Sequence, residues 1–134
     1  MEKHVIDLSI YRYNKAIDCF KIAQKLYRDG ELAYAQNRAY YSLFDAIRAV
    51  TVLDGFDSSK HSGIISYFNQ AYVKTGIFKP EVSKIIRLAS MLREKSDYED
   101  FYVPDNQDTQ EVISLVKDFL DDIKGYLKKK NISL

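Results

Sequence analysis

The chain has 134 residues and a mass of 15.6 kDa, with 46% hydrophobic residues, 29% charged residues and a formal net charge of +1. This length and composition indicate a single domain, residues 1–134, and exclude a disordered tail, a collagen and a low-complexity protein. The sequence has one cysteine, no leader-like apolar run at its start and no apolar stretch of the roughly 18 residues that span a bilayer, so we expect a cytoplasmic protein without membrane contact.

Apolar residues recur at helical spacing in five segments, at 8–28, 31–53, 60–73, 80–95 and 109–129. Gly30 and Gly55 suit the ends of the first two helices, because glycine adopts the left-handed conformation of a helix cap. Pro80 suits the first turn of the fourth helix, where no N–H donor is needed. The fifth segment carries the clearest apolar stripe, with Phe119 at its centre. Residues 96–106 read as a loop.

No segment alternates apolar and polar residues between turn signals, so the sequence predicts an all-α fold. Long helices with short connections favour an up-and-down four-helix bundle with an additional short helix. The chain lacks a glycine-rich phosphate loop and the Glu-x-x-His pairs of a di-iron bundle. One cysteine and two histidines, His4 and His61, are too few and too distant for a zinc site. We therefore expect neither a metal nor a cofactor.

Charge is distributed unevenly along the chain. Residues 60–95 carry 7 basic and 2 acidic side chains, a net of +5, whereas residues 96–134 carry 5 basic and 9 acidic side chains, a net of −4. The middle segment either attracts phosphate or is an ordinary solvated helix face. Lys84 and Arg87, three residues apart on the fourth helix, would form part of a phosphate track.

The second helix carries a polar face formed by Arg38, Tyr41, Asp45 and Arg48, at spacings of three and four residues. These side chains lie beside the apolar stripe, so they could line a groove. The alternative is a network of Tyr41–Asp45 and Asp45–Arg48 contacts within the helix that only orders the surface.

Two further polar clusters stand at helix ends. Lys60-His61 begins the third helix, where free N–H groups attract an anion and the histidine could act as a general base. Arg93, Asp97 and Tyr98 end the fourth helix, where cations suit the helix dipole. On residue type alone, these clusters are a capping histidine and a helix end with an Arg93–Asp97 salt bridge.

Four motifs follow one another in a characteristic order: Arg-Ala-Tyr-Tyr-x-x-Phe at 38–44, Lys-His-Ser-Gly-Ile-Ile at 60–65, Val-Lys-Thr-Gly at 73–76 and Arg-x-x-x-Asp-Tyr at 93–98. Together they resemble the small stand-alone HEPN (higher eukaryote and prokaryote nucleotide-binding) proteins, over about residues 10–127. The resemblance implies a helical bundle of HEPN type that often forms a homodimer. It also implies genetic pairing with a minimal nucleotidyltransferase in a prokaryotic toxin–antitoxin or defence module.

The same resemblance implies where catalysis would occur. Active HEPN ribonucleases carry Arg-x4–6-His, need no metal, and use the ribose 2′-hydroxyl to attack the adjacent phosphate. Arg93 matches the arginine, but Tyr98 stands where a histidine is common, and a tyrosine hydroxyl is a poor base at neutral pH. Either His61 transfers the proton from another helix, or this protein does not cut RNA.

Three functions follow. The favoured one is a nucleotide- or RNA-binding HEPN module that acts with a nucleotidyltransferase and has weak or no nuclease activity. The second is a metal-independent endoribonuclease toxin that uses Arg93 with Asp97, Tyr98 or His61. The third is a structural dimerisation bundle without a ligand. For the first two, we expect Arg38, Tyr41, Asp45, Lys84 and Arg87 to bind the nucleotide or RNA.

Overall fold

The computed structural model describes residues 1–134 and contains helices only, which confirms the all-α fold. The five main helices are α1 (Lys3–Arg28), α2 (Leu32–Thr51), α3 (His61–Phe68), α4 (Glu81–Tyr98) and α5 (Asn106–Lys129). A short 3₁₀ turn, η1 (Val52–Asp54), follows α2, and a π-helical turn, η2 (Asn69–Val73), follows α3. None of the helices is long and apolar enough to span a membrane.

Helix boundaries differ from the sequence prediction by a few residues. The first helix begins at Lys3 rather than near residue 8, and α4 continues to Tyr98 rather than ending near residue 95. The fifth helix begins at Asn106 because Asp105 caps it. The Asp105 carboxylate accepts hydrogen bonds from the N–H groups of Gln107 at 2.6 Å and Asp108 at 3.1 Å. The predicted loop therefore shortens to residues 99–105.

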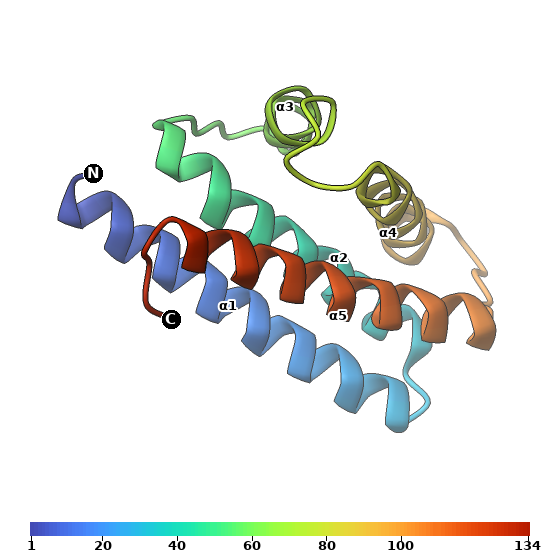
Figure 1. The fold of residues 1–134 in the computed structure, drawn as a ribbon. Coiled ribbons are helices and arrows are strands. Elements are labelled where there is room, and N and C mark those ends of the chain that lie inside the picture. The colour runs from blue at the N-terminus through green and yellow to red at the C-terminus, as the bar shows by residue number, and fades with distance from the viewer.

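The second helix, α2, is the centre of the bundle and packs against α1, α3, α4 and α5. Figure 1 shows α1, α2 and α5 lying side by side, with α1 and α2 running in opposite directions. The helices α3 and α4 are seen nearly end-on in that view, so they cross the other three. The architecture is the expected four-helix bundle, α1, α2, α4 and α5, with α3 as the additional short helix.

One continuous apolar core of 29 buried residues joins all five helices. Phe119, at the middle of the α5 stripe, has no exposed surface. Its ring centroid lies 6.0 Å from that of Phe68 and 6.4 Å from that of Phe78. Aromatic side chains at the end of α3 and after it therefore close the core against α5.

The interface between α1 and α2 is held by two serines as well as by apolar packing. Ser9 of α1 donates its hydroxyl hydrogen to the carbonyl of Ala49 in α2. Ser42 of α2 donates in the opposite direction, to the carbonyl of Ala16 in α1, at 2.7 Å. Both serines are fully buried. The two bonds oppose sliding of one helix along the other, because any small slide would break both buried hydrogen bonds.

Candidate functional site

Helices α2 and α4 meet at the guanidinium group of Arg93. Its Nη2 donates a hydrogen bond to the hydroxyl of Tyr41 at 3.1 Å. The guanidinium carbon lies 5.0 Å from the ring centroid of Tyr40, 5.5 Å from that of Tyr41 and 5.8 Å from that of Tyr98. These distances are typical of cation–π contacts, so three tyrosine rings surround the cation.

Asp97, one helical turn after Arg93, is the only carboxylate in ion-pair contact with it. The Nε of Arg93 lies 3.0 Å from Oδ2 of Asp97, and the two side chains are 19% and 24% exposed. The other oxygen of Asp97 accepts a hydrogen bond of 2.7 Å from the amide of Asn37 in α2. The Nε–H of Arg93 is not aligned for a hydrogen bond with Asp97, and Nη1 donates none within the chain. Nε is buried, so the group that remains available to an anion is Nη1.

A second arginine, Arg38, also lies close to the Tyr41 ring. Its guanidinium carbon is 4.9 Å from the Tyr41 ring centroid. Its Nε and Nη2 both donate to the side-chain oxygen of Asn37, at 2.9 and 2.7 Å. Asn37 therefore links Arg38 to Asp97. Two guanidinium groups face one carboxylate, so the cluster carries a net positive charge.

His61, the first residue of α3, joins this cluster from a third helix. Its Nδ1 shares a hydrogen bond of 3.0 Å with the hydroxyl of Tyr40, and its ring stacks on Phe44 with centroids 3.9 Å apart. Burial lowers the pKa of His61, and the charges of Arg93 and Arg48 lower it further. Burial raises the pKa of Tyr40 to about 12, although Arg93 opposes the shift. At neutral pH the imidazole is therefore neutral and the phenol keeps its proton.

The structure thus brings together Arg38, Tyr41, His61, Arg93, Asp97 and Tyr98, which we call the Arg93 site. Two further residues, Tyr40 and Asn37, contact this site and were not expected there from the sequence. The Tyr40 side chain is buried in the core, but its hydroxyl reaches His61. Asn37 is a polar residue one helical turn before Tyr41, and this spacing could have indicated that it lies on the same face.

Asp45 does not join the Arg93 site. It is 6% exposed and faces α1, where its carboxylate accepts a weak hydrogen bond of 3.9 Å from the thiol of Cys19. Burial raises the pKa of Asp45, while Lys15 and other nearby cations act against that rise. Asp45 forms no hydrogen bond or ion pair with Tyr41 or Arg48, so the alternative network within α2 is absent as well. At 100° per residue, Asp45 lies near the boundary between the polar face of α2 and the face that packs against α1. The packing of α1 places its side chain on the buried side of that boundary.

Lys84 and Arg87 also lie apart from the Arg93 site. Both are exposed on α4. Arg87 lines a groove between α3 and α4, whereas Lys84 does not border that groove. Lys84 and Arg87 share a face of α4, since they are three residues apart, but only Arg87 borders the groove, so the expected track does not include Lys84 there.

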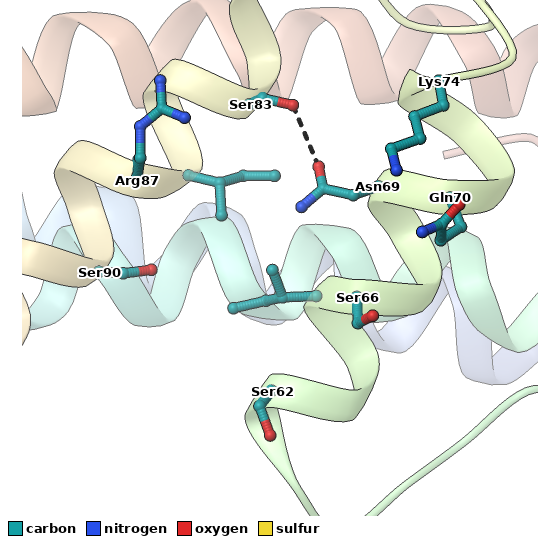
Figure 2. Close-up of a pocket in the computed structure, with 10 residues that line it drawn as sticks. Ser62, Ser66, Asn69, Gln70, Lys74, Ser83, Arg87 and Ser90 are labelled. Carbon is teal, nitrogen blue, oxygen red and sulfur yellow. Dashed lines mark hydrogen bonds between the residues drawn. The ribbon is translucent and has the colours of Figure 1, made fainter.

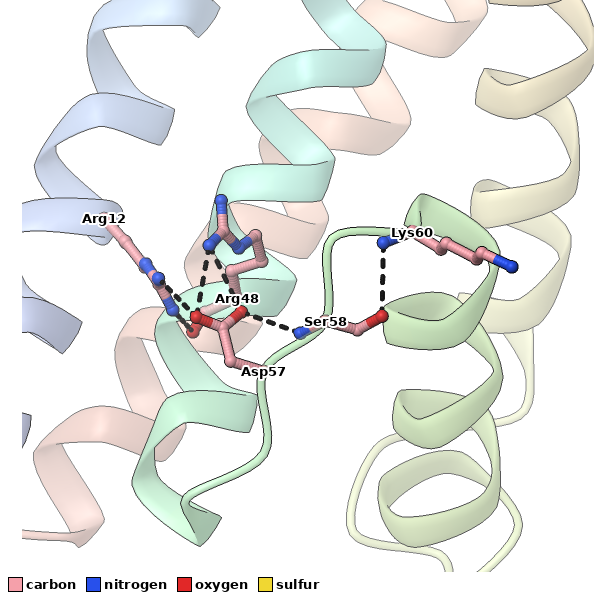
Figure 3. Close-up of polar contacts among 5 residues, drawn as sticks. All are labelled: Arg12, Arg48, Asp57, Ser58 and Lys60. Atoms are coloured by element: carbon pink, nitrogen blue, oxygen red, sulfur yellow. Dashed lines mark hydrogen bonds and ion pairs between the residues drawn. The ribbon is translucent and has the colours of Figure 1, made fainter.

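The loop before His61 is held by the ion cluster shown in Figure 3. Asp57 accepts a hydrogen bond of 3.1 Å from Arg12 of α1 and one of 3.2 Å from Arg48 of α2. Burial alone would raise the pKa of Asp57, but the hydrogen bond from Arg12 and the two positive charges outweigh it and lower that pKa. The next residue, Ser58, accepts from the N–H of Lys60 at 3.1 Å. These contacts fix the chain that delivers His61 to the Arg93 site.

Arg93→Ala is expected to raise the pKa of His61 toward the free value of about 6.5, because it removes a positive charge that disfavours the imidazolium. Titration of the His61 ring protons by NMR measures this shift. In the wild type the pKa of His61 is lower in the folded chain than in the unfolded chain, so near pH 6 the unfolded chain binds more protons. The free energy of unfolding therefore rises with pH until His61 is neutral in both states, above about pH 6.5. An identical His61 pKa in both proteins would contradict the electrostatic coupling of the two residues.

Comparison with known proteins gives related sequences over most of the chain. Residues 11–126 match the family described as the HEPN domain. A "UPF0332 protein" of Thermotoga maritima is 32% identical over 118 residues, which cover 88% of this chain and 89% of that protein. Two proteins of Methanocaldococcus jannaschii are named "Putative toxin". One is 27% identical over 88% of this chain and 80% of its own length, and the other is 32% identical over 78% and 74%.

Proposed function

The chain belongs to the HEPN domain family, and on that premise we propose that it is a toxin-like module that binds a nucleotide or RNA at the Arg93 site, with weak or no nuclease activity. The observation that carries this proposal is the Arg93 guanidinium, which tyrosine rings hold in place while its Nη1 makes no hydrogen bond within the chain. The names of two relatives, which describe toxins, support the toxin-like part.

The chemistry of the site suits a phosphate beside a base. Arginine binds phosphate oxygens through paired N–H donors, and Arg38 lies close enough to Tyr41 to add a second guanidinium to the same anion. Tyr98 is 73% exposed, so its ring can stack on a nucleobase at the edge of the site. A phosphate between the two arginines would balance the excess positive charge of the cluster.

Endoribonuclease activity is the second candidate, and the position of His61 favours it. A neutral imidazole next to a guanidinium is the pairing that metal-independent RNA cleavage needs, with the imidazole accepting the proton of the 2′-hydroxyl and Arg93 stabilising the charge on phosphorus. One histidine would have to serve this step, and its Nδ1 is already engaged by Tyr40. We therefore rank binding above cleavage.

The deciding experiment uses a fluorescein-labelled single-stranded RNA of about twelve uridines and, separately, ATP, both in EDTA. We expect saturable binding measured by anisotropy, with the RNA intact on a denaturing gel after hours. Cleavage to products ending in a 2′,3′-cyclic phosphate, lost in His61→Ala, would establish the ribonuclease instead. Absence of binding to either probe would leave the third hypothesis, a structural bundle without a ligand.

We also propose a homodimer, and a nucleotidyltransferase as the protein partner. Large apolar side chains are exposed at the end of α4 and in the loop after it: Tyr98 at 73%, Phe101 at 100% and Val103 at 86%. Such residues are enriched at interfaces. Light scattering at micromolar concentration should give about twice the chain mass of 15.6 kDa, and a monomer would contradict the dimer.

Co-purification with a nucleotidyltransferase encoded beside the gene tests the second partner.

A further inference from the structure

A polar groove runs between α3 and α4, outside the Arg93 site, and is drawn in Figure 2. Its volume is ≈ 620 Å³. Polar side chains of five types line it, together with the two isoleucines Ile65 and Ile86: Ser62, Ser66, Asn69, Gln70, Lys74, Ser83, Arg87 and Ser90. The groove thus combines hydroxyl groups, amides and two cations.

The charged side chains that line this groove are all positive. No carboxylate lines it, and neither Lys74 nor Arg87 takes part in an ion pair. The two cations come from opposite walls, since Lys74 follows the π-helical turn and Arg87 lies on α4. Such a groove attracts an anion that can be contacted from both sides.

The π-helical turn η2 places amide groups in the groove. It widens the backbone over Asn69–Val73, and Asn69 accepts a hydrogen bond of 3.2 Å from the hydroxyl of Ser83 across the groove, as Figure 2 shows. The side-chain NH₂ of Asn69 donates no hydrogen bond within the chain. Single π-helical turns are found frequently at functional sites. Here the turn leaves a donor facing the groove beside Lys74.

The groove and the Arg93 site are adjacent along both helices. Ser62 directly follows His61 on α3, and Ser90 precedes Arg93 by one turn on α4. A chain-like ligand with one phosphate at Arg93 can therefore continue into the groove.

We propose that this groove binds the sugar–phosphate backbone of a single-stranded RNA that enters the Arg93 site, an inference that rests on the proposed function. Hydroxyls, amides and cations suit phosphate oxygens and ribose 2′-hydroxyls. No aromatic ring lines the groove, so it offers bases no stacking surface, and they point outward. Binding in the groove is therefore independent of base sequence.

The test compares the wild type with the double variant Lys74→Ala/Arg87→Ala, using the fluorescein-labelled uridine 12-mer and ATP as probes. Loss of two phosphate contacts should weaken RNA binding about ten- to a hundredfold and reduce the slope of log affinity against log salt by about 1.4. The affinity for ATP should fall less than the affinity for RNA, because one nucleotide covers less of the groove than a 12-mer does. Lys21→Ala/Lys25→Ala is the matched control. It removes two exposed cations from α1, a helix that contacts neither α3 nor α4.

The outcomes separate the groove from the proposed function. If Arg93→Ala weakens RNA binding and the groove variant binds RNA like the control, the groove proposal is wrong and the Arg93 site stands. Equal losses for RNA and ATP in the groove variant would also overturn it, because both cations would then belong to the nucleotide site. A wild type that binds neither probe overturns the proposed function and the groove together. If polyglutamate displaces the RNA when both are present at the same concentration of charge, the groove binds acidic polymers in general, and the proposal of an RNA-binding groove is wrong.

Discussion

Phe119→Ala is expected to lower the free energy of unfolding by about 3–5 kcal/mol. The Phe119 ring is fully buried among Phe68, Phe78 and the apolar faces of the bundle. Truncation removes the transfer free energy of the ring and leaves a cavity that rigid helices refill only in part. Urea unfolding followed by circular dichroism measures the loss.

An exposed position of the same helix supplies the control. Lys124 is exposed and takes part in no ion pair, so Lys124→Ala should change the free energy of unfolding by no more than about 0.5 kcal/mol. A loss below about 1 kcal/mol for Phe119→Ala would mean that α5 is peripheral to the core, contrary to the packing described above.

Arg93→Ala is expected to weaken the binding of the uridine 12-mer and of ATP by about 1.5–3 kcal/mol, or roughly ten- to 150-fold. The variant removes the one guanidinium that joins Tyr41, Tyr98 and Asp97. Fold stability should fall by only about 1 kcal/mol or less, because the pair with Asp97 is partly exposed and screened by solvent. Anisotropy titration and urea unfolding on the same samples give the two numbers.

Arg28→Ala provides the matched control for this prediction, since Arg28 is an exposed arginine in the last turn of α1 without an ion pair. It should leave both probes bound as in the wild type. Unaltered RNA and ATP binding in Arg93→Ala, together with a large loss of stability, would make the contacts of Arg93 a structural clasp between α2 and α4.

Most of the fold could be predicted from the sequence because helical periodicity and turn glycines are local signals. Gly30 and Gly55 both have positive φ angles, 79° and 75°, as a left-handed cap requires. The Arg93–Asp97 pair in the last turn of α4 follows from local spacing, but the hydrogen bond of Asp97 with Asn37 of another helix, which also holds this turn, could not be predicted. Tertiary contacts decide such ends, not residue type.

The site could be predicted only in part, for a similar reason. Arg93, Asp97 and Tyr98 share one local motif, and their proximity follows from helix geometry. The contribution of Tyr40 depends on where α3 places His61, and that position depends on Asp57 reaching Arg12, 45 residues away in sequence. Asp45 was included in the site because of its spacing on the helix face, but that spacing does not reveal that α1 covers its side chain.

The pair of opposed serine bonds between α1 and α2 has a consequence for motion at the site. Because Ser9 and Ser42 fix the register of these helices, α2 cannot slide to accommodate a ligand without breaking a buried hydrogen bond. Helix register shifts take microseconds to milliseconds, whereas rotamer changes of exposed side chains take picoseconds to nanoseconds. Adjustment to a ligand therefore falls to side chains such as Tyr98 and Arg38, on a backbone whose geometry is already set before the ligand arrives.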